Sequence, residues 1–434
     1  MTETVIAVDI GTSSMKAAAI SSGGEVLARS RQKLLMRGSR WVAGDWSVTL
    51  EKLLLDLCDQ LDSRPVDALC LSGNGPTLVG GDGCGDTLAW DDEAGSDDGG
   101  KLSGKAGDPG NGMAASVPAA ESGTACASLF IPRLRLFKER YPEAWKNSPS
   151  IYSGPEYLIH QLTGAKLTIL PEERYRTAYW TDDALREAGF TEKDAAKLPP
   201  FVKPGTTAGT LKNYIAPNVQ SGLPVYCGAP DFISALVGTN SLTPGSLCDR
   251  AGSSEGLNFC SDTPLAGDGI RTLPSVVPGL WNASVLLPES GSRFSAFKDR
   301  VEQERCESIS FEELVHRCLY NPGQEAIFDQ GKYLMLQTAM QVRDSLKVLL
   351  ACAADKAQRV PDRMTVTGGQ ASNDEWNQMK ANVTGLTVLV PACSDAELLG
   401  DAVFAFTGMG LFPSVAEGAA ALCSNAKCFE PEAF

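Results

Sequence analysis

Histidine is nearly absent from this chain of 434 residues, which contains only His160 and His316. Two histidines so far apart in the sequence argue against a Ser-His-Asp triad and against a metal centre built on histidine. The 13 cysteines include no Cys-x-x-Cys pair, so we expect most of them to be small buried side chains. No apolar run is long enough to span a bilayer, so the sequence predicts no membrane-spanning helix.

Basic residues are outnumbered, because 38 lysines and arginines face 53 aspartates and glutamates, giving a net charge of −15. This balance argues against nucleic acid and against an anionic membrane surface as partners. It does not argue against ATP, because a local lysine, backbone N–H groups and Mg²⁺ can bind phosphates. The chain enters a predicted strand almost at once, without a basic segment followed by an apolar one. We therefore expect no signal peptide and a cytoplasmic location.

Residues 5–20 predict a strand, a tight polar turn and a second strand. The turn consists of Gly11, Thr12, Ser13 and Ser14. Such a turn can direct backbone N–H groups and hydroxyls at an anion, and Lys16 adds a positive charge just beyond it. Asp9 beside an anion site is repulsive unless a cation lies between them, and Mg²⁺ is the usual one. The stretch predicts a phosphate-binding hairpin with a metal-facing Asp9, and an ordinary β-hairpin with a solvated Asp9 fits it equally well.

A second hairpin of the same kind is predicted in the other half of the chain. Residues 245–260 give a strand, a turn of Gly252, Ser253 and Ser254, and an apolar strand. This turn echoes the first one. Two phosphate-type hairpins, one in each half, suggest two similar domains that face one nucleotide.

A glycine turn before a helix forms the third segment of interest. Residues 364–381 predict a strand, a turn at Gly368 and Gly369, and a helix with Ser372 or Asn373 as its N-cap. The base, ribose or phosphate of a nucleotide can closely approach a helix N-terminus that follows such a turn. The segment therefore predicts a nucleotide contact.

An aspartate near the start of a helix is the candidate general base. Residues 224–227 predict a short strand, and Asp231 follows it after Pro230. Proline disfavours helix for the residue before it, so the helix begins at or just after Pro230. Asp231 fits a helix cap, which contributes about 1 kcal/mol. It also fits a general base, because a helix N-terminus favours the ionised carboxylate.

In their order along the chain, these segments resemble the FGGY carbohydrate kinases of the actin/Hsp70/sugar-kinase superfamily. This family has xylulokinase-like members. Residues 129–164, 228–238 and 396–410 resemble further segments of the same family. The resemblance implies an α/β fold of two ribonuclease H-like (actin-like ATPase) domains with mixed sheets around a central cleft. Residues 1–222 would form the sugar side with the first hairpin. Residues 223–434 would carry the catalytic aspartate, the second hairpin and the adenosine site.

The resemblance also implies roles for individual residues. Asp231 is the implied general base, and Mg²⁺ is held by way of Asp9. The residues implied to bind ATP are Gly11, Thr12, Ser13, Ser14, Lys16, Gly252, Ser253, Gly291, Gly368, Gly369 and Asn373. The residues implied to bind the sugar are Gly75, Pro76, Thr77, Trp90, Asp92, Asp231 and Phe232. A tryptophan face suits the C–H surface of a sugar, although a turn and a core tryptophan fit this stretch nearly as well.

The implied reaction is the ATP-dependent phosphorylation of a hydroxyl on a small sugar or polyol, with a ketopentose such as xylulose as first candidate. Glycerol or another polyol is the alternative acceptor. A degenerate member that binds nucleotide or sugar as a regulator, and an actin- or Hsp70-like ATPase, are the alternative classes. Glu93 and Ala94 stand where many relatives have an arginine, and the match weakens between residues 306 and 341. A homodimer is compatible with any of these classes.

Three further expectations concern the rest of the chain. Residues 93–126 are rich in glycine, alanine, serine and aspartate, which predicts a flexible excursion. Residues 46–61 and 334–354 predict amphipathic helices with one buried face. The acidic residues near the last helix are interpreted as solvated or capping charges. They are Asp395, Glu397 and Asp401.

Overall fold

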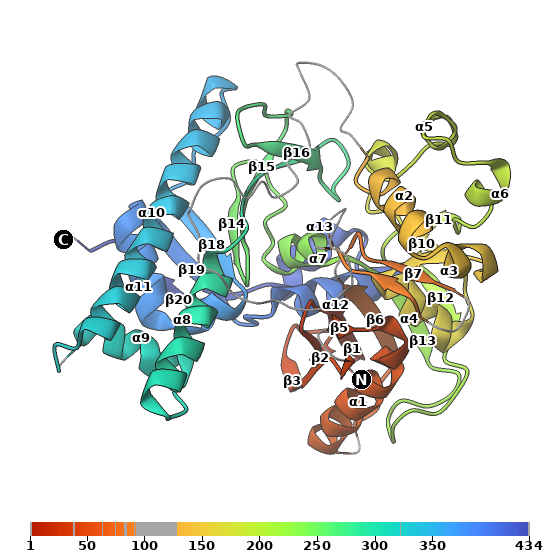
Figure 1. The fold of residues 1–434 in the computed structure, drawn as a ribbon, viewed down its shortest axis with the longest axis horizontal. Coiled ribbons are helices and arrows are strands. Elements are labelled where there is room, and N and C mark those ends of the chain that lie inside the picture. Colours follow the sequence, from red (N-terminus) through yellow and green to blue (C-terminus); the bar gives the residue numbers. More distant parts are fainter. Residues whose placement is uncertain are drawn as a thin grey trace.

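A computed structural model describes residues 2–37, 40–62, 64–73, 75–81, 85–90, 92, 128–321 and 323–432 (Figure 1). The excursion predicted at residues 93–126 lies outside these ranges. Within them, no helix combines the length and the apolar character that crossing a membrane requires. The molecule is built around two mixed sheets that lie on either side of helices α7 and α12 (Figure 1).

The first sheet has six strands in the order β12-β13-β6-β1-β2-β3. Its strands are β1 (Thr4–Ile10), β2 (Ser14–Ser21), β3 (Val26–Lys33), β6 (Ala68–Gly73), β12 (Thr207–Thr210) and β13 (Pro224–Pro230). The hairpins β1-β2-β3 are antiparallel, whereas β1, β6 and β13 run parallel, so their carboxyl ends meet at one edge. That edge is where an α/β fold places ligands.

Both faces of the first sheet are covered, which explains the unbroken burial of its central strand β1. Ile6 and Val8 pack with helix α1 (Trp46–Leu61). The alternate residues, Val5 and Ala7, pack with α7 (Asp231–Gly238) and α12 (Ala396–Gly408) on the other face. The period of two along the strand thus assigns its side chains to two different cores.

The second sheet has seven strands in the order β16-β17-β15-β14-β18-β19-β20. Its strands are β14 (Leu247–Ala251), β15 (Glu255–Ser261), β16 (Arg271–Pro274), β17 (Trp281–Leu287), β18 (Arg363–Thr367), β19 (Thr387–Pro391) and β20 (Asn425–Phe429). Four helices accompany it: α8 (Ser290–Arg305), α9 (Phe311–Tyr320), α10 (Ala326–Asp355) and α11 (Asp374–Thr384). The buried stripe of α10 includes Val342, Leu346 and Leu349, and it packs against this sheet.

Shorter strands and helices lie mostly between residues 36 and 202. The strands are β4 (Met36–Arg37), β5 (Arg40–Trp41), β7 (Leu78–Gly80), β8 (Thr87–Leu88), β9 (Ile151–Ser153), β10 (Thr168–Ile169) and β11 (Phe201–Val202). The helices are α2 (Ile131–Arg140), α3 (Pro142–Asn147), α4 (Gly154–Thr163), α5 (Asp182–Glu187) and α6 (Glu192–Ala195), and α13 (Val415–Leu422) lies near the end of the chain. Short 3₁₀ turns are η1 (Ala43–Asp45), η2 (Glu173–Thr177) and η3 (Gly369–Ser372).

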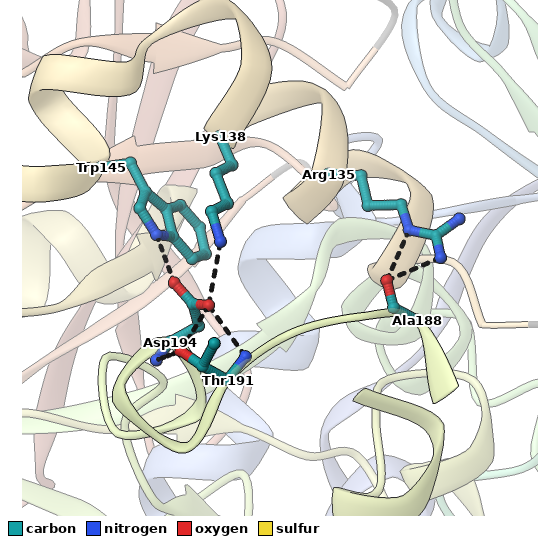
Figure 2. A network of polar contacts seen from close by, with 6 residues as sticks. All are labelled: Arg135, Lys138, Trp145, Ala188, Thr191 and Asp194. Carbon is teal, nitrogen blue, oxygen red and sulfur yellow. Dashed lines mark hydrogen bonds and ion pairs between the residues drawn. The ribbon is translucent and has the colours of Figure 1, made fainter. Parts of the chain in front are cut away.

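A buried carboxylate joins α2 and α3 to α6, as Figure 2 shows. Asp194 accepts hydrogen bonds from Lys138 Nζ at 2.9 Å and from the Trp145 indole at 2.7 Å. It also forms a capping box with Thr191 at the start of α6. Although burial acts in the opposite direction, these donors hold the pKa of Asp194 well below its usual value. The nearby Arg135 secures the same layer by donating to the carbonyl of Ala188.

The structure tests several of the local predictions. The helix predicted at residues 46–61 is α1, and the helix predicted at 334–354 is the later part of α10. The strand predicted at 224–227 is β13, which continues to Pro230 and pairs with β6. The strand that follows the predicted boundary at residue 222 therefore belongs to the first sheet. The division of the chain into two domains at this point stays a prediction.

Candidate active site

The first hairpin closes at the carboxyl end of β1. The Gly11 N–H donates to the Ser14 carbonyl at 3.0 Å, and Asp9 lies opposite Lys16 in the strand register. Thr12 and Ser13 are exposed, whereas Ser14 is buried and accepts a hydrogen bond from Arg31 Nε at 3.0 Å. The exposed side of the turn therefore presents the hydroxyls of Thr12 and Ser13.

Asp9 is not solvated, because only 3% of the residue is exposed. The alternative of an ordinary hairpin with a solvated Asp9 is therefore wrong. Ser72 Oγ lies 3.4 Å from its carboxylate. Burial raises the pKa of Asp9 to about 7; Lys16 opposes this, and the carboxylates of Glu397, Asp231 and Asp395 add to it. A buried carboxylate in such surroundings favours a cation as neighbour.

Lys16 is paired with Asp395, which the sequence predicts to be a solvated or capping charge. Its Nζ lies 2.8 Å from Asp395 Oδ1, just before α12. Burial opposes both charges, yet Lys16 lowers the pKa of Asp395, while Glu397, Asp395 and Asp9 raise the pKa of Lys16. Asp395 occupies the N-cap position of α12, in line with one of the two interpretations, but its side chain makes no capping hydrogen bond and pairs with Lys16 instead. Asp395 thereby joins the end of the second sheet to the first hairpin.

Asp401, inside α12, is also buried rather than solvated. Ser234 Oγ of α7 donates to its Oδ1 at 2.7 Å, and its Oδ2 has no hydrogen-bond partner among the described residues. Burial raises the pKa of Asp401 well above its usual value, while the hydroxyls of Ser72 and Ser234 act in the opposite direction. The interpretation of Asp401 as a solvated or capping charge is wrong.

The second hairpin is held against the start of α8. The Gly252 N–H donates to the Ser254 carbonyl at 3.0 Å, and the Ser292 N–H donates to the Ser253 carbonyl at 2.9 Å. A Cβ atom on Gly291 would collide with the Gly252 carbonyl. Only glycine permits this close approach, so the structure brings Gly291 directly against the predicted phosphate turn.

The glycine turn before α11 meets the same hairpin from the other side. Gly368 has a φ of +92°, and a Cβ there would lie 2.7 Å from the Ala251 carbonyl oxygen. Gly369 opens η3, and no protein atom lies within 4 Å of an added Cβ. Asn373 caps α11, accepting the Trp376 N–H at 2.8 Å, which decides between the two predicted caps. Close backbone approaches therefore join Gly291 to the second turn and Gly368 to the end of β14.

Asp231 is the first residue of α7, with Pro230 in the N-cap position. Its Oδ1 accepts the Phe232 N–H at 2.6 Å, and its Oδ2 lies 3.4 Å from Arg250 Nη2. Its side chain is 31% exposed, so the carboxylate is accessible from solvent. Asp231 does not occupy the N-cap position of α7. Its side chain accepts one backbone N–H of the first turn, that of Phe232.

The predicted sugar side is a second cluster that touches the first hairpin. The Trp90 N–H donates to Thr77 Oγ1 at 3.2 Å, and its indole N–H donates to Thr12 Oγ1 at 3.0 Å. Trp90 is 37% exposed, so it is not the core tryptophan of the alternative interpretation. Asp92 Oδ2 accepts the Ala89 N–H at 2.8 Å and lies 3.8 Å from Arg140.

Arg133 of α2, which no motif in the sequence indicated, forms hydrogen bonds to several parts of this cluster. Its Nε donates to the Pro76 carbonyl at 2.8 Å, and its other nitrogens reach the carbonyls of Asp92 and Ala89. Five donors on a rigid fork suit one arginine to several carbonyls. The segments that carry Pro76 and Asp92 are thereby held to one helix.

Two ion pairs and one charge effect involve residues of the two hairpins. Lys16 pairs with Asp395 before α12, the charge of Asp231 acts on Asp9, and Arg250 beside the second turn contacts Asp231. Phe232, which is partly buried, lies under the Arg250 guanidinium at 5.9 Å from its ring centroid. The catalytic, sugar-binding and ATP-binding roles of these residues stay predictions.

Within the described ranges, no group of three or more His, Cys, Asp or Glu side chains is arranged to hold a metal ion. Asp9 is therefore a single carboxylate rather than part of a protein cage. Mg²⁺ is commonly bound by one or two carboxylates together with substrate phosphates, and a single carboxylate beside a phosphate turn is consistent with that pattern.

Comparison with known proteins supports the resemblance to one family. Residues 334–409 match the C-terminal domain of the FGGY family of carbohydrate kinases. This segment is therefore similar to the FGGY carbohydrate kinases. Autoinducer-2 kinases from Escherichia coli (strain SMS-3-5 / SECEC) and Salmonella paratyphi A (strain ATCC 9150 / SARB42) are each 22% identical to it over 344 residues. These alignments cover 68% of this chain and 64% of each relative, so the chain matches just under two thirds of the length of these relatives.

Solved structures show that the likeness in fold extends over the whole chain. Xylulose kinase from Rhodospirillum rubrum superimposes with a TM-score of 0.70 at 17% identity, covering 99% of this chain and 94% of that one. Plasmodium falciparum glycerol kinase with ADP gives a TM-score of 0.72 at 13% identity, covering 100% and 95%. The predicted fold, with two actin-like ATPase domains and mixed sheets, is confirmed.

Proposed function

We propose that this protein is an FGGY carbohydrate kinase, which transfers the γ-phosphate of ATP to a hydroxyl of a small sugar or polyol. The observation that carries the proposal is the accessible Asp231 carboxylate at the start of α7, which lies beside Arg250 near the second phosphate turn. Its charge also acts on Asp9 of the first hairpin. The match of residues 334–409 supports the reaction class, because the matched family comprises carbohydrate kinases.

In the proposed reaction, Asp231 accepts the proton of the acceptor hydroxyl. The hydroxyl oxygen forms a bond to the γ-phosphorus, and the bond from that phosphorus to the β-phosphate oxygen breaks, leaving its electron pair on ADP. The turn of Thr12 and Ser13 and the turn of Gly252 and Ser253 orient the phosphates. Positioning and electrostatics carry such transfers, and no covalent enzyme intermediate is required.

Asp9 is the residue that would hold Mg²⁺, which supplies neutralisation of the phosphate charge when it is bound. The adenosine would lie against Gly369 and Asn373, where the protein leaves open space beside Gly369. Trp90 and Asp92 would face the acceptor, together with Phe232. This assignment puts the acceptor beside the first hairpin and the adenosine beside α11.

A ketopentose such as xylulose is our first candidate acceptor. Glycerol kinase and gluconate kinase stand among the structural neighbours, and autoinducer-2 kinases are among the sequence relatives. These substrate names apply to the relatives and the structural neighbours. Glycerol, gluconate and autoinducer-2 are therefore acceptors to test with this protein. A cytoplasmic location and a homodimer are further expectations of the proposal.

Coupled detection of ADP with one acceptor at a time tests the proposal. The purified protein is incubated with Mg²⁺, ATP and either xylulose, glycerol, gluconate or autoinducer-2. ADP release that depends on one acceptor supports the kinase. ADP release without any acceptor would favour an actin- or Hsp70-like ATPase. Nucleotide binding without ADP release from any acceptor would favour a regulator.

A further inference from the structure

Arg250 lies between the proposed general base and the proposed phosphate turn, and the mechanism above gives it no role. It is on β14, two residues before Gly252, and the Gly252 N–H lies 3.3 Å from the Arg250 carbonyl. Its guanidinium contacts Asp231 Oδ2 at 3.4 Å. One residue therefore joins, through its backbone and side chain, the two groups that must act on the same phosphate.

The contact with Asp231 leaves much of the guanidinium uncommitted. Arginine and carboxylate can form two parallel hydrogen bonds of 2.7–2.9 Å, typical of charged pairs. Here one contact of 3.4 Å is present, and Arg250 Nε is buried without a hydrogen-bond partner in the described part of the chain. A buried donor without a partner is costly, and a ligand that accepts a hydrogen bond from this guanidinium would relieve that cost.

The charges around the cleft indicate which ligand this is. Lys16 is already engaged with Asp395 at 2.8 Å, so its charge is largely matched by a protein carboxylate. Arg250 has the longer, single contact, and its side chain is 24% exposed. A planar guanidinium suits phosphate oxygens, which accept paired hydrogen bonds and, on a terminal phosphate, carry more charge than one carboxylate.

We propose that Arg250 binds the terminal phosphate of ATP and, in doing so, releases Asp231 to act as the base. Without nucleotide the guanidinium rests on the Asp231 carboxylate. When a triphosphate occupies the two turns, the guanidinium turns to the γ-phosphate oxygens. Asp231 then accepts the hydroxyl proton as the new O–P bond forms and ADP leaves with the electron pair of the broken bond. This inference rests on the proposed kinase function.

Nucleotide binding tests the inference without knowledge of the acceptor. Calorimetry with Mg²⁺ measures the affinity for ADP and for the non-hydrolysable β,γ-imido analogue of ATP, in the wild type and in Arg250→Met. Charged hydrogen bonds contribute about 1.5–3 kcal/mol, so we expect the variant to lose about 10- to 150-fold in affinity for the analogue. Its affinity for ADP should change less than about threefold.

Arg317→Met is the matched control. Arg317 pairs with Glu313 at 2.7 Å and lies 5.9 Å from the centroid of Phe328, which is the distance that separates Arg250 from Phe232. It is on α9, which packs beside α10 rather than at the phosphate turns. We expect its replacement to leave the affinities for both nucleotides unchanged.

The outcomes separate this inference from the proposed function. Equal loss of ADP and analogue binding in Arg250→Met would assign Arg250 a structural role, and no loss would remove it from the phosphate site. Weaker binding of gluconate alone would assign it to an anionic acceptor. If Arg250→Met does not fold, Arg250→Lys takes its place, because lysine keeps the positive charge but lacks the planar guanidinium. A selective loss of affinity for the ATP analogue is again expected. A wild type that binds neither nucleotide overturns both ideas.

Discussion

Replacing Asp231 by asparagine separates its structural contribution from a role as general base. Asparagine has the size of aspartate, and its side-chain oxygen can still accept the Phe232 N–H that Asp231 accepts at 2.6 Å. What it loses is the negative charge and the capacity to take up a proton. The substitution therefore changes chemistry while leaving the packing at the start of α7 in place.

The structure sets the expected size of each effect. The contact with Arg250 joins side chains that are 31% and 24% exposed, and such pairs contribute about 0.2–1 kcal/mol. A carboxylate in the first turn of a helix adds about 0.3–1 kcal/mol. We therefore expect the unfolding free energy to fall by less than about 2 kcal/mol. Loss of a general base lowers kcat by about 10²–10⁴, or about 2.7–5.5 kcal/mol in the barrier.

The assay compares Asp231→Asn with the wild type, using the acceptor that the ADP screen identifies as substrate. Steady-state kinetics give kcat and the KM of each substrate, and urea unfolding gives the stability. Asp374→Asn is the matched control, because Asp374 is also the first residue of a helix, α11, and pairs with Lys427 at 2.6 Å. A kcat near that of the wild type in Asp231→Asn would refute the assignment and return Asp231 to a structural role.

Three further substitutions test other parts of the structure. Gly369→Val should raise the KM of ATP more than that of the acceptor with little change in stability, because an added Cβ meets no protein atom within 4 Å; an unchanged KM of ATP would remove Gly369 from the adenosine site. Asp194→Ala should lower the unfolding free energy by about 2–3 kcal/mol at pH 7, because a helix cap is lost and a buried indole N–H loses its acceptor. Since the pKa of Asp194 is lower in the folded protein, its contribution is complete above the unfolded value of about 3.9 and declines as the pH falls further. Urea midpoints at pH 7 and pH 3 measure this, and an equal loss at both would contradict it. Lys380→Met should cost about 3–5 kcal/mol in urea unfolding, because it leaves the buried carboxylates of Asp249 and Glu255 together without their cation; a loss below 1 kcal/mol would show that these groups are neutral in the native state.

Local patterns in the sequence were sufficient to predict individual helices and hairpins, whereas the arrangement of the two mixed sheets was predicted from the family resemblance. The leucine spacing of residues 46–61 predicted α1 with the bounds that the structure has, since a single buried face imposes a strict period. The two hairpins were predicted from polar turns between apolar strands, and β1 to β2 and β14 to β15 confirm them. These features depend on neighbours in the sequence.

The charged contacts of the site could not be predicted in the same way. Lys16 and Asp395 are separated by most of the chain, and a carboxylate before a helix looks like a cap or a solvated group in the sequence. Asp401 has the same ambiguity, and only the fold shows that it is buried against Ser234. Arg250 was passed over because a single arginine in a strand has no periodic signal, whereas its position beside Asp231 depends on how two sheets meet.

The position of Asp231 depends on how closely α7 and α12 approach each other. A Cβ on Gly238 would collide with the Ala396 carbonyl, and a Cβ on Gly400 would collide with the Ser234 carbonyl. The two helices therefore meet backbone to backbone, and α12 in turn packs on the first sheet. Such contacts vary little in distance, because no flexible side chain lies between them. The start of α7 is thus fixed relative to β1, so the carboxylates of Asp231 and Asp9 belong to one rigid frame rather than to two independently moving halves.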